Sequence, residues 1–306
     1  MRINLDIISK ELKKREINKI VKFNEPLKKH TSLRIGGPVD IFCTPNTIEE
    51  LKKVISISKE YDIPFWVIGN GTNILILDKG VRGIVIKLNQ GFKKIIFFDK
   101  IVKVGAGVSL IYLGKIALKR ELSGLEFVCS IPGTLGGAII NNASFNGNCM
   151  ADIVQDVTFL TEENNLESAS KSDLDFNYRK CNLKGRSAII LKATLQLKEG
   201  NKEKIESKIR KNIKIRKAKQ PIDKLSAGSI FKNPPGYYAA ELIEKVGAKG
   251  LSQGKAEVSC KHANFIINNE NATARDVLYL IEEIEKRVKE AFNIELNREI
   301  QILGEL

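Results

Sequence analysis

The chain has 306 residues, of which 43% are hydrophobic and 28% are charged, and its formal net charge at pH 7 is +14. This composition excludes an intrinsically disordered chain, and the length predicts two or three folded domains. Residues 1–16 mix charged with apolar side chains and so lack the core of a signal peptide, and no stretch approaches the ~18 apolar residues of a membrane span. We therefore expect a cytoplasmic protein that has no membrane partner.

The excess positive charge comes mostly from lysines that are spread along the whole chain. Such charge raises nucleic acid as a partner, but it suits equally well an enzyme whose substrates carry phosphate groups. The 5 cysteines and the 2 histidines, His30 and His262, show no spacing typical of zinc ligands. We therefore expect reduced thiols and no metal site.

The first predicted elements alternate helices with short strands. An amphipathic helix is expected within residues 1–23, where apolar residues recur on one side. Thr47-Ile48-Glu49-Glu50 has the pattern of a capping box, which predicts a helix that runs to about Tyr61. Buried strands are expected at residues 39–43, 65–68, 74–77 and 81–88.

The sequence Gly69-Asn70-Gly71-Thr72-Asn73 lies between two of these strands. Glycine allows backbone N–H groups to approach a ligand closely, and successive N–H groups in a turn form a concave anion site. The sequence is not a dinucleotide-binding fingerprint, because a third glycine is missing and no helix follows. On the residues alone, a hairpin turn that uses Asn-Gly chemistry is an equal alternative.

A second glycine-rich stretch, residues 124–142, reads GLEFVCSIPGTLGGAIINN and is apolar between its glycines. It follows strands expected at 95–98 and 101–104 and a helix expected over 109–120. A turn of this kind can offer backbone N–H groups to a phosphate-bearing cofactor. A tight strand-to-helix turn packed in the core is the alternative interpretation.

The second half of the chain predicts strands at 154–160 and 188–197, separated by an acidic loop, and then a basic helix over 201–219 that connects to a last unit. That unit contains a small-residue turn at 225–235 and helices that start near 239 and 273. The helix near 273 has a capping pattern, Thr273-Ala274-Arg275-Asp276. The unit ends in a strand at 294–302, in which Glu299 points away from the apolar face. Short strands and few helices argue for α+β layers and against a doubly wound parallel sheet.

Seven segments of the chain resemble, in the same order, the bacterial UDP-N-acetylenolpyruvoylglucosamine reductases. These segments are HTSLRIGGPVDIF (30–42), VIGNGTNILI (67–76), GLEFVCSIPGTLGGAIINNASFNG (124–147), FNYRKC (176–181), AGSIFKNP (227–234), EVSCKHANFIIN (257–268) and ELNREIQILG (295–304). The resemblance covers nearly the whole chain. The family consists of flavoenzymes that complete UDP-N-acetylmuramate for peptidoglycan.

The resemblance implies an α+β fold with an FAD-binding domain of the PCMH or vanillyl-alcohol-oxidase type, built from two subdomains, and a C-terminal substrate-binding domain. The first subdomain is expected at residues 1–89, joined by the C-terminal strand 294–306, the second at 90–217, and the substrate-binding domain at 218–293. FAD is expected to bind non-covalently, with NADPH as co-substrate and a UDP-sugar as substrate. We expect a monomer.

The resemblance also implies roles for individual residues. Arg179, Ser229 and Glu299 stand at the positions that the family uses for catalysis. Substrate contacts are expected from Lys219, Asn233 and Tyr178. Two loops are expected to hold the FAD pyrophosphate, and their residues are Gly69, Asn70, Gly71, Thr72, Asn73, Ile131, Pro132, Gly133, Gly136, Gly137 and Ala138.

The implied reaction adds hydride from the reduced flavin to C3 of the enolpyruvyl group and a proton to C2. Arg179 would bind the substrate carboxylate through two N–H groups, a protonated Glu299 would donate to the same oxygens, and Ser229 would deliver the proton. Two other interpretations stay open. One is an FAD-linked oxidase of sugars or alcohols with the same fold, and the other is a basic nucleic-acid-binding protein. Because the latter depends on charge alone, no nucleic-acid partner is expected.

Overall fold

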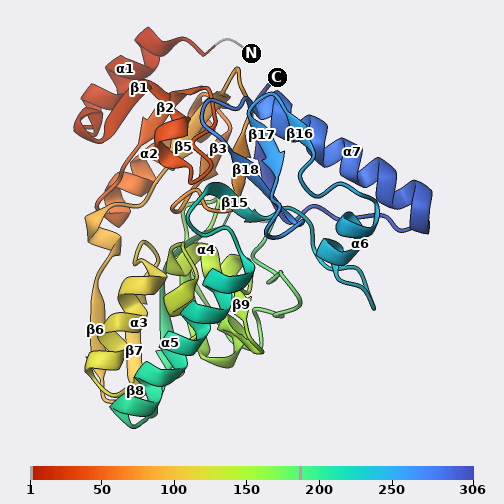
Figure 1. The fold of residues 1–306 in the computed structure, drawn as a ribbon. Helices are drawn as coiled ribbons and strands as arrows, with labels where there is room; N and C mark the ends of the chain where they lie inside the picture. The colour runs from red at the N-terminus through yellow and green to blue at the C-terminus, as the bar shows by residue number, and fades with distance from the viewer. Residues whose placement is uncertain (1–2, 186–187) are drawn as a thin grey trace. The chain divides into compact units, whose positions relative to one another are not determined.

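The computed structural model describes residues 3–185 and 188–306. The chain divides into two compact units, and Figure 1 traces it from the N-terminus to the C-terminus. The first unit comprises the described residues within Met1–Lys22, Ile41–Gly69 and Gly83–Ile215, and the second comprises Phe23–Asp40, Asn70–Arg82 and Arg216–Leu306. Within the described ranges, no helix combines the length and the apolar character that crossing a bilayer requires.

A five-stranded antiparallel sheet with the strand order β12-β11-β13-β7-β6 lies in the first unit. Val157, Ala193 and Val104 stand opposite one another across its three middle strands, and all three are buried. Because opposite residues share a face of a sheet, they mark the face that packs on the core. The strands are β6 (Ile95–Phe98), β7 (Ile101–Gly105), β11 (Val154–Leu160), β12 (Leu166–Ser170) and β13 (Ile189–Gln196).

The helices of the first unit bury apolar residues at helical spacing. In α3 (Leu110–Lys119) the buried residues include Leu110 and Leu113, and they join the same core as the sheet. Helix α5 (Lys202–Lys219) lies beside α3 (Figure 1) and packs through Ile205 and Ile209 against Leu118 and Cys129. The remaining elements are α1 (Leu5–Lys14), α2 (Ile48–Glu60), α4 (Leu135–Ile140) and the short pairs β8 (Leu122–Ser123) with β14 (Lys198–Glu199) and β9 (Ser144–Phe145) with β10 (Asn148–Cys149).

A four-stranded sheet with the order β1-β2-β5-β3 includes three strands that run from one unit into the other. Its strands are β1 (Val21–Pro26), β2 (Pro38–Cys43), β3 (Phe65–Val67) and β5 (Val81–Ile86). Strands β3 and β5 are parallel, with Trp66 opposite Val85. The chain therefore leaves and re-enters each unit more than once.

The second unit contains the sheet β15-β18-β17-β16 and the long helix α7 (Ala274–Phe292), which packs against β16 and β17. Val277, Leu280, Ile281, Ile284 and Val288 form the buried stripe of α7. In addition, β4 (Ile74–Ile76) pairs in parallel with the C-terminal strand β19 (Gln301–Leu303). The other elements are β15 (Leu225–Ser229), α6 (Ala239–Lys245), β16 (Ser252–Gln253), β17 (Ala256–Val258) and β18 (Phe265–Asn268).

The predicted helix starts are confirmed where a capping box was visible in the sequence. Thr47 Oγ1 accepts a hydrogen bond from Glu50 N at 3.1 Å, and Glu50 Oε2 accepts one from Thr47 N at 3.3 Å. Thr273 caps α7 in the same way through Asp276. These reciprocal bonds satisfy backbone N–H groups that have no partner inside the helix.

Three predicted elements have wrong extents. The first helix ends at Lys14, where Glu16 follows with a φ of 60°, and residues 21–26 form strand β1; Met1 and Arg2 lie outside the described residues. The expected acidic loop contains β12, a mostly exposed edge strand whose polar residues hide its pairing with β11. The strand expected at 294–302 is regular only from Gln301 onward.

The capping box of α2 generates a test of local stability. Thr47→Ala removes the side-chain acceptor for Glu50 N, so we expect the free energy of unfolding to fall by about 1 kcal/mol. Urea denaturation followed by circular dichroism measures this change. Lys52→Ala, one turn further along the helix, is the matched control and should change the free energy by less than about 0.5 kcal/mol. Equal effects in the two variants would contradict the role of the cap.

Candidate functional site

The loop Gly69–Asn73 is held by the segment that contains His30 and Ser32. Ser32 donates to the carbonyl of Gly71 from its backbone N at 3.0 Å and from its Oγ at 3.2 Å. Gly71 has a φ of +62°, and a Cβ there would lie 2.1 Å from the carbonyl oxygen of His30. Only glycine fits this position, because both the conformation and the space exclude a side chain.

Gly69, the one residue of the first loop that belongs to the first unit, lies against the second loop. A Cβ on Gly69 would lie 2.5 Å from Thr134 Oγ1, so the absence of a side chain at Gly69 allows Thr134 to approach. Thr134 is the N-cap of α4, and its Oγ1 accepts from Gly137 N at 3.4 Å. Strand β3 pairs with β5 whereas β4 pairs with β19, so the alternative that the loop is a hairpin turn is wrong.

The stretch 131–138 is partly a loop and partly the first turn of α4. Its interior is fixed by Leu135 N, which donates to the Val108 carbonyl at 2.9 Å, and by Gly136 N, which donates to the Ala106 carbonyl at 2.9 Å. Among residues 3–185 and 188–306, the backbone N–H groups of Gly133 and Thr134 have no hydrogen-bond acceptor. Donors of this kind beside Gly69 suit an anionic group such as a diphosphate.

Arg179 lies at the tip of a tight turn in the first unit. Asn177 and Lys180 exchange backbone hydrogen bonds of 2.9 and 3.2 Å, which leaves Tyr178 and Arg179 as the two central residues. Tyr178 is 56% exposed, and Arg179 has a φ of 57°. Non-glycine residues in this conformation carry strain and are concentrated at functional sites.

The Arg179 turn is attached to the C-terminal end of α4. Asn142 Nδ2 donates to the Asn177 carbonyl at 3.1 Å, and Lys184 Nζ donates to Asn141 Oδ1 at 2.6 Å. Because Asn141 and Asn142 directly follow α4, the helix that starts in the glycine-rich loop ends at the Arg179 turn. The predicted loop and the predicted catalytic arginine are thus parts of one local structure.

Ser229 and Glu299 are brought together in the second unit. Glu299 N donates to the Ile230 carbonyl at 2.7 Å, and Lys232 N donates to the Asn297 carbonyl at 2.8 Å. The residue after Ser229 is therefore bonded directly to Glu299. Both side chains are half-buried.

Asn73 joins the same structure from the end of its loop. Its Nδ2 donates to the Glu299 carbonyl at 3.2 Å, and its own carbonyl accepts from Gln301 N at 3.1 Å. The segment that carries Ser229 is held from the other side by Asn264, which is 4% exposed. Asn264 Oδ1 accepts from Phe231 N at 2.9 Å, and Asn264 Nδ2 donates to the Phe231 carbonyl at 2.8 Å.

A cationic cluster of Lys219, Lys249 and Lys261 lies near the end of α5 in the second unit, and Lys249 Nζ also pairs with Glu244 Oε1 at 2.9 Å. Burial lowers the pKa of His262, and the charges of Lys249 and Lys219 lower it further. Lys261 Nζ donates to the Lys217 carbonyl at 2.6 Å, which places a third ammonium group next to this part of the helix. The sequence pointed to Lys219 alone, because the other cations are distant in the chain and lie in no recognisable motif.

Asn233 has a structural contact. Its Oδ1 accepts from Ala239 N at 3.1 Å and so holds the start of α6. Its role in substrate binding stays a prediction, as do those of Lys219 and Tyr178. Arg179 belongs to the first unit, whereas Ser229 and Glu299 belong to the second, so their joint action on one substrate also stays a prediction. The described residues contain no group of three or more side chains suited to a metal ion.

Two family models match successive parts of the chain. Residues 39–170 match the family model of an FAD binding domain, and residues 220–303 match that of the UDP-N-acetylenolpyruvoylglucosamine reductase, C-terminal domain. The UDP-N-acetylenolpyruvoylglucosamine reductase of Caldanaerobacter subterraneus subsp. tengcongensis is 49% identical over 282 residues, which are 92% of this chain and 93% of that protein. The chain belongs to the UDP-N-acetylenolpyruvoylglucosamine reductase family.

Two further family members support this assignment. The Bacillus subtilis reductase is 40% identical over 98% of this chain and 99% of its own length. The crystal structure of the Thermus caldophilus reductase superimposes with a TM-score of 0.80 at 37% identity, covering 93% of this chain and 98% of that one. The predicted family, the α+β fold with an FAD-binding domain and a C-terminal domain, and FAD as the cofactor are confirmed.

The close approach at Gly71 generates a test of the loop. Gly71→Ala should lower the free energy of unfolding by several kcal/mol and reduce the FAD retained on purification, because backbone atoms of His30 block a Cβ. Gly247→Ala is the matched control, since Gly247 has a similar φ of +66° with no atom within 4 Å of its Cβ position. The control should lose only about 1–2 kcal/mol through backbone strain. Calorimetry and the flavin-to-protein absorbance ratio measure both effects, and equal losses would argue against a clash.

Proposed function

We propose that this protein reduces UDP-N-acetylglucosamine enolpyruvate to UDP-N-acetylmuramate, a peptidoglycan precursor, with NADPH as reductant and FAD as cofactor. The observation that carries this proposal is the 49% identity to a named reductase over 92% of the chain. The hydrogen bond from Glu299 N to the Ile230 carbonyl adds support, because it brings together Ser229 and Glu299, the two residues of the second unit that the resemblance predicts to be catalytic. We further propose that the protein acts as a cytoplasmic monomer that binds no nucleic acid.

The flavin fits the two glycine-rich loops. The N–H groups of Gly133 and Thr134, next to Gly69, are suited to donate to its diphosphate. The N–H groups of Asn70 and Gly71 also lack acceptors among the residues that the structure describes, so the first loop can contribute donors as well. When bound, FAD supplies hydride transfer from NADPH to C3 of the enolpyruvyl group.

Arg179 is proposed to bind the substrate carboxylate. The guanidinium presents parallel N–H donors that match the two oxygens of a carboxylate, and it stays charged at any working pH. Addition of hydride to C3 moves negative charge through C2 into that carboxylate. A fixed cation there stabilises the transition state more than the ground state. The strained backbone of Arg179 supports a functional rather than a purely structural role.

Glu299 and Ser229 are proposed to complete the reaction. In its protonated form, Glu299 donates a hydrogen bond to the same carboxylate oxygens and adds to the stabilisation of the developing charge. Ser229 delivers a proton to C2. A hydroxyl is a weak acid, so it serves only against a strongly basic carbanion, and such general-acid help is typically worth ~10²–10⁴-fold in rate.

The cationic cluster of Lys219, Lys249 and Lys261 is proposed to bind the diphosphate of the UDP-sugar. Ammonium groups act as point charges for phosphate, and they need no fixed orientation. The lowered pKa of His262 favours a neutral ring. Its Nδ1 accepts from Asn264 N at 3.3 Å, so Nε2 carries the proton and can donate one hydrogen bond beside them. Asn233 and Tyr178 are proposed as further substrate contacts, since both are exposed.

Visible spectroscopy under anaerobic conditions tests the proposed activity. The purified protein should be yellow, lose its flavin absorbance on addition of NADPH and regain it on addition of the enolpyruvyl substrate. Rapid reoxidation by air without this substrate would favour an oxidase instead. A colourless protein whose affinity for DNA falls steeply with salt would favour nucleic-acid binding.

Substitution of Ser229 separates the two half-reactions. Ser229→Ala should leave flavin reduction by NADPH unchanged and slow flavin reoxidation by the substrate ~10²–10⁴-fold, because only the second step needs the proton. Stopped-flow absorbance measures each step alone. Ser226→Ala, on the same strand, is the matched control and should alter neither rate. Equal losses in both half-reactions of Ser229→Ala would contradict its role as proton donor.

Substitution of Arg179 tests carboxylate binding. Arg179→Lys keeps the charge but loses the paired N–H donors, so substrate-driven reoxidation should slow roughly 10–100-fold while reduction by NADPH is retained. Lys180→Gln, in the same turn, removes a neighbouring charge and should leave both rates within about twofold, since a surface charge contributes little. If the control slows reoxidation as much as Arg179→Lys does, long-range charge and not the paired contact is responsible.

A further inference from the structure

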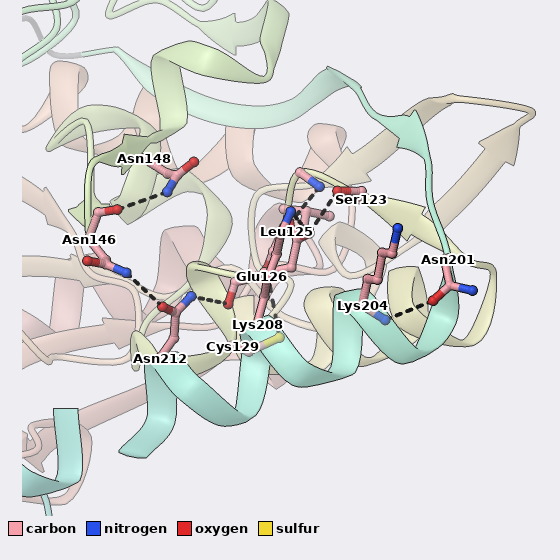
Figure 2. Close-up of polar contacts among 11 residues, drawn as sticks. Ser123, Leu125, Glu126, Cys129, Asn146, Asn148, Asn201, Lys204, Lys208 and Asn212 are labelled. Atoms are coloured by element: carbon pink, nitrogen blue, oxygen red, sulfur yellow. Dashed lines mark hydrogen bonds and ion pairs between the residues drawn. The ribbon is translucent and has the colours of Figure 1, made fainter. Parts of the chain in front are cut away.

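One buried side chain of α5 is hydrogen-bonded to the chain on both sides of residues 131–138, which we call the second flavin loop. We propose that Asn212 is a positioning residue for this loop, because it holds the segment before the loop and the hairpin after it at a fixed separation. Figure 2 shows Asn212 between Glu126 on one side and Asn146 on the other. The proposal rests on the proposed function, in which residues 131–138 hold the FAD diphosphate.

Asn212 makes both contacts through its own amide group. Its Nδ2 donates to the Glu126 carbonyl at 3.3 Å, and its Oδ1 accepts from Asn146 Nδ2 at 3.2 Å. The side chain is 6% exposed, so water does not replace these bonds freely. An amide is required here because it is the side-chain group that presents a donor and an acceptor side by side.

The position of Asn212 on α5 would otherwise favour an apolar residue. Ile205, Ile209 and Asn212 follow one another at helical spacing and are the buried residues of this helix. Burying an amide costs free energy unless it is hydrogen-bonded, and even then it contributes less than a well-packed leucine. An amide on this face therefore indicates that the two bonded segments must be aligned, in addition to the stability that packing of the helix provides.

The turn at residues 123–126, which precedes the loop, is held by hydrogen bonds of its own. Glu126 is 8% exposed, and its carboxylate accepts from Ser123 Oγ and from Gly124 N, each at 2.7 Å. Burial alone would raise the pKa of Glu126, but these hydrogen bonds and the ammonium of Lys208 at 3.6 Å outweigh it, so the pKa is lowered. Figure 2 shows the carboxylate closing this turn. Asn212 is thus bonded to a turn whose own conformation is fixed by these contacts.

The hairpin after the loop is joined to α4. Asn146 occupies its tip with a φ of 51°, and Asn148 Nδ2 donates to the Asn146 carbonyl at 3.0 Å. At the base of the hairpin, Ala143 N donates to the Ala138 carbonyl at 2.8 Å. Because Ala138 belongs to the first turn of α4, the position of the hairpin is linked to the end of the flavin loop.

Removal of the amide tests the proposal on the full-length apoprotein, with FAD and ADP as probes. Asn212→Leu replaces the amide by an apolar side chain of similar size, which suits the buried position, so the fold should be retained. The dissociation constants of both FAD and ADP should rise about tenfold, as loss of roughly 1.4 kcal/mol implies. Asn146→Gly removes the partner amide and suits the positive φ. It should raise both constants similarly, and the two changes combined should be less than additive. Fluorescence titration measures the binding.

Asn201→Ala is the matched control. Asn201 Oδ1 accepts from Lys204 N at 2.9 Å and caps the same helix, but it contacts neither segment. It should lower the melting temperature while leaving the FAD dissociation constant unchanged. If Asn201→Ala weakens FAD as much as Asn212→Leu does, the effect of Asn212 is general stability and the proposal is overturned. Unchanged FAD binding in Asn146→Gly overturns it as well, even if Asn212→Leu fails to fold.

A variant in the loop itself distinguishes this proposal from the proposed function. Gly137 is exposed, and a Cβ there would meet its nearest atom at 3.5 Å, so Gly137→Glu adds a negative charge to the loop without a clash. It should weaken FAD binding by at least tenfold. If Gly137→Glu has no effect, the assignment of the loop to the FAD diphosphate fails. If it weakens FAD while Asn212→Leu and Asn146→Gly do not, only the role of Asn212 fails.

Discussion

The hydrogen bond of 2.7 Å from Glu299 N to the Ile230 carbonyl joins two segments that lie far apart in the chain. It is made by backbone atoms, so it fixes the spacing of Ser229 and Glu299 whatever their side chains do. Asn73 supports the same pairing from a third segment. A shift of register would leave several buried backbone groups without partners, which makes this arrangement costly to distort.

Amide side chains recur wherever an irregular segment of the site must be held. Asn264 bonds both polar groups of the Phe231 backbone, Asn142 holds the Arg179 turn, and Asn212 bonds Glu126 and Asn146 on the two sides of residues 131–138. Irregular segments expose N–H and carbonyl groups that no neighbouring strand satisfies. The side-chain amide of an asparagine can bond these groups in place of a strand, because it carries the same donor and acceptor as a peptide group. The loops are thus held by specific polar contacts in addition to apolar packing.

The sequence predicted those features whose cause is local. The helix starts at Thr47 and Thr273 could be predicted because a capping box lies within four residues. The glycine-rich loops could be located from composition and family resemblance. Strand β12 was missed because its mostly exposed residues show no apolar pattern. Its backbone hydrogen bonds to β11 alone define it as an edge strand. The cations around Lys219 and the contacts of Asn212 depend on distant segments. Nothing in their own neighbourhood signals them.

The repeated passage of the chain between the two units has a consequence for biosynthesis. Strand β4 is synthesised long before its partner β19, because residues 74–76 and 301–303 lie far apart in the chain. The second unit therefore cannot complete this pairing until residues 301–303 have been synthesised, and its early segments must wait in a partly assembled state. Neither unit corresponds to a continuous piece of the gene, so a product truncated before Arg216 would keep every segment of the first unit but only two short segments of the second.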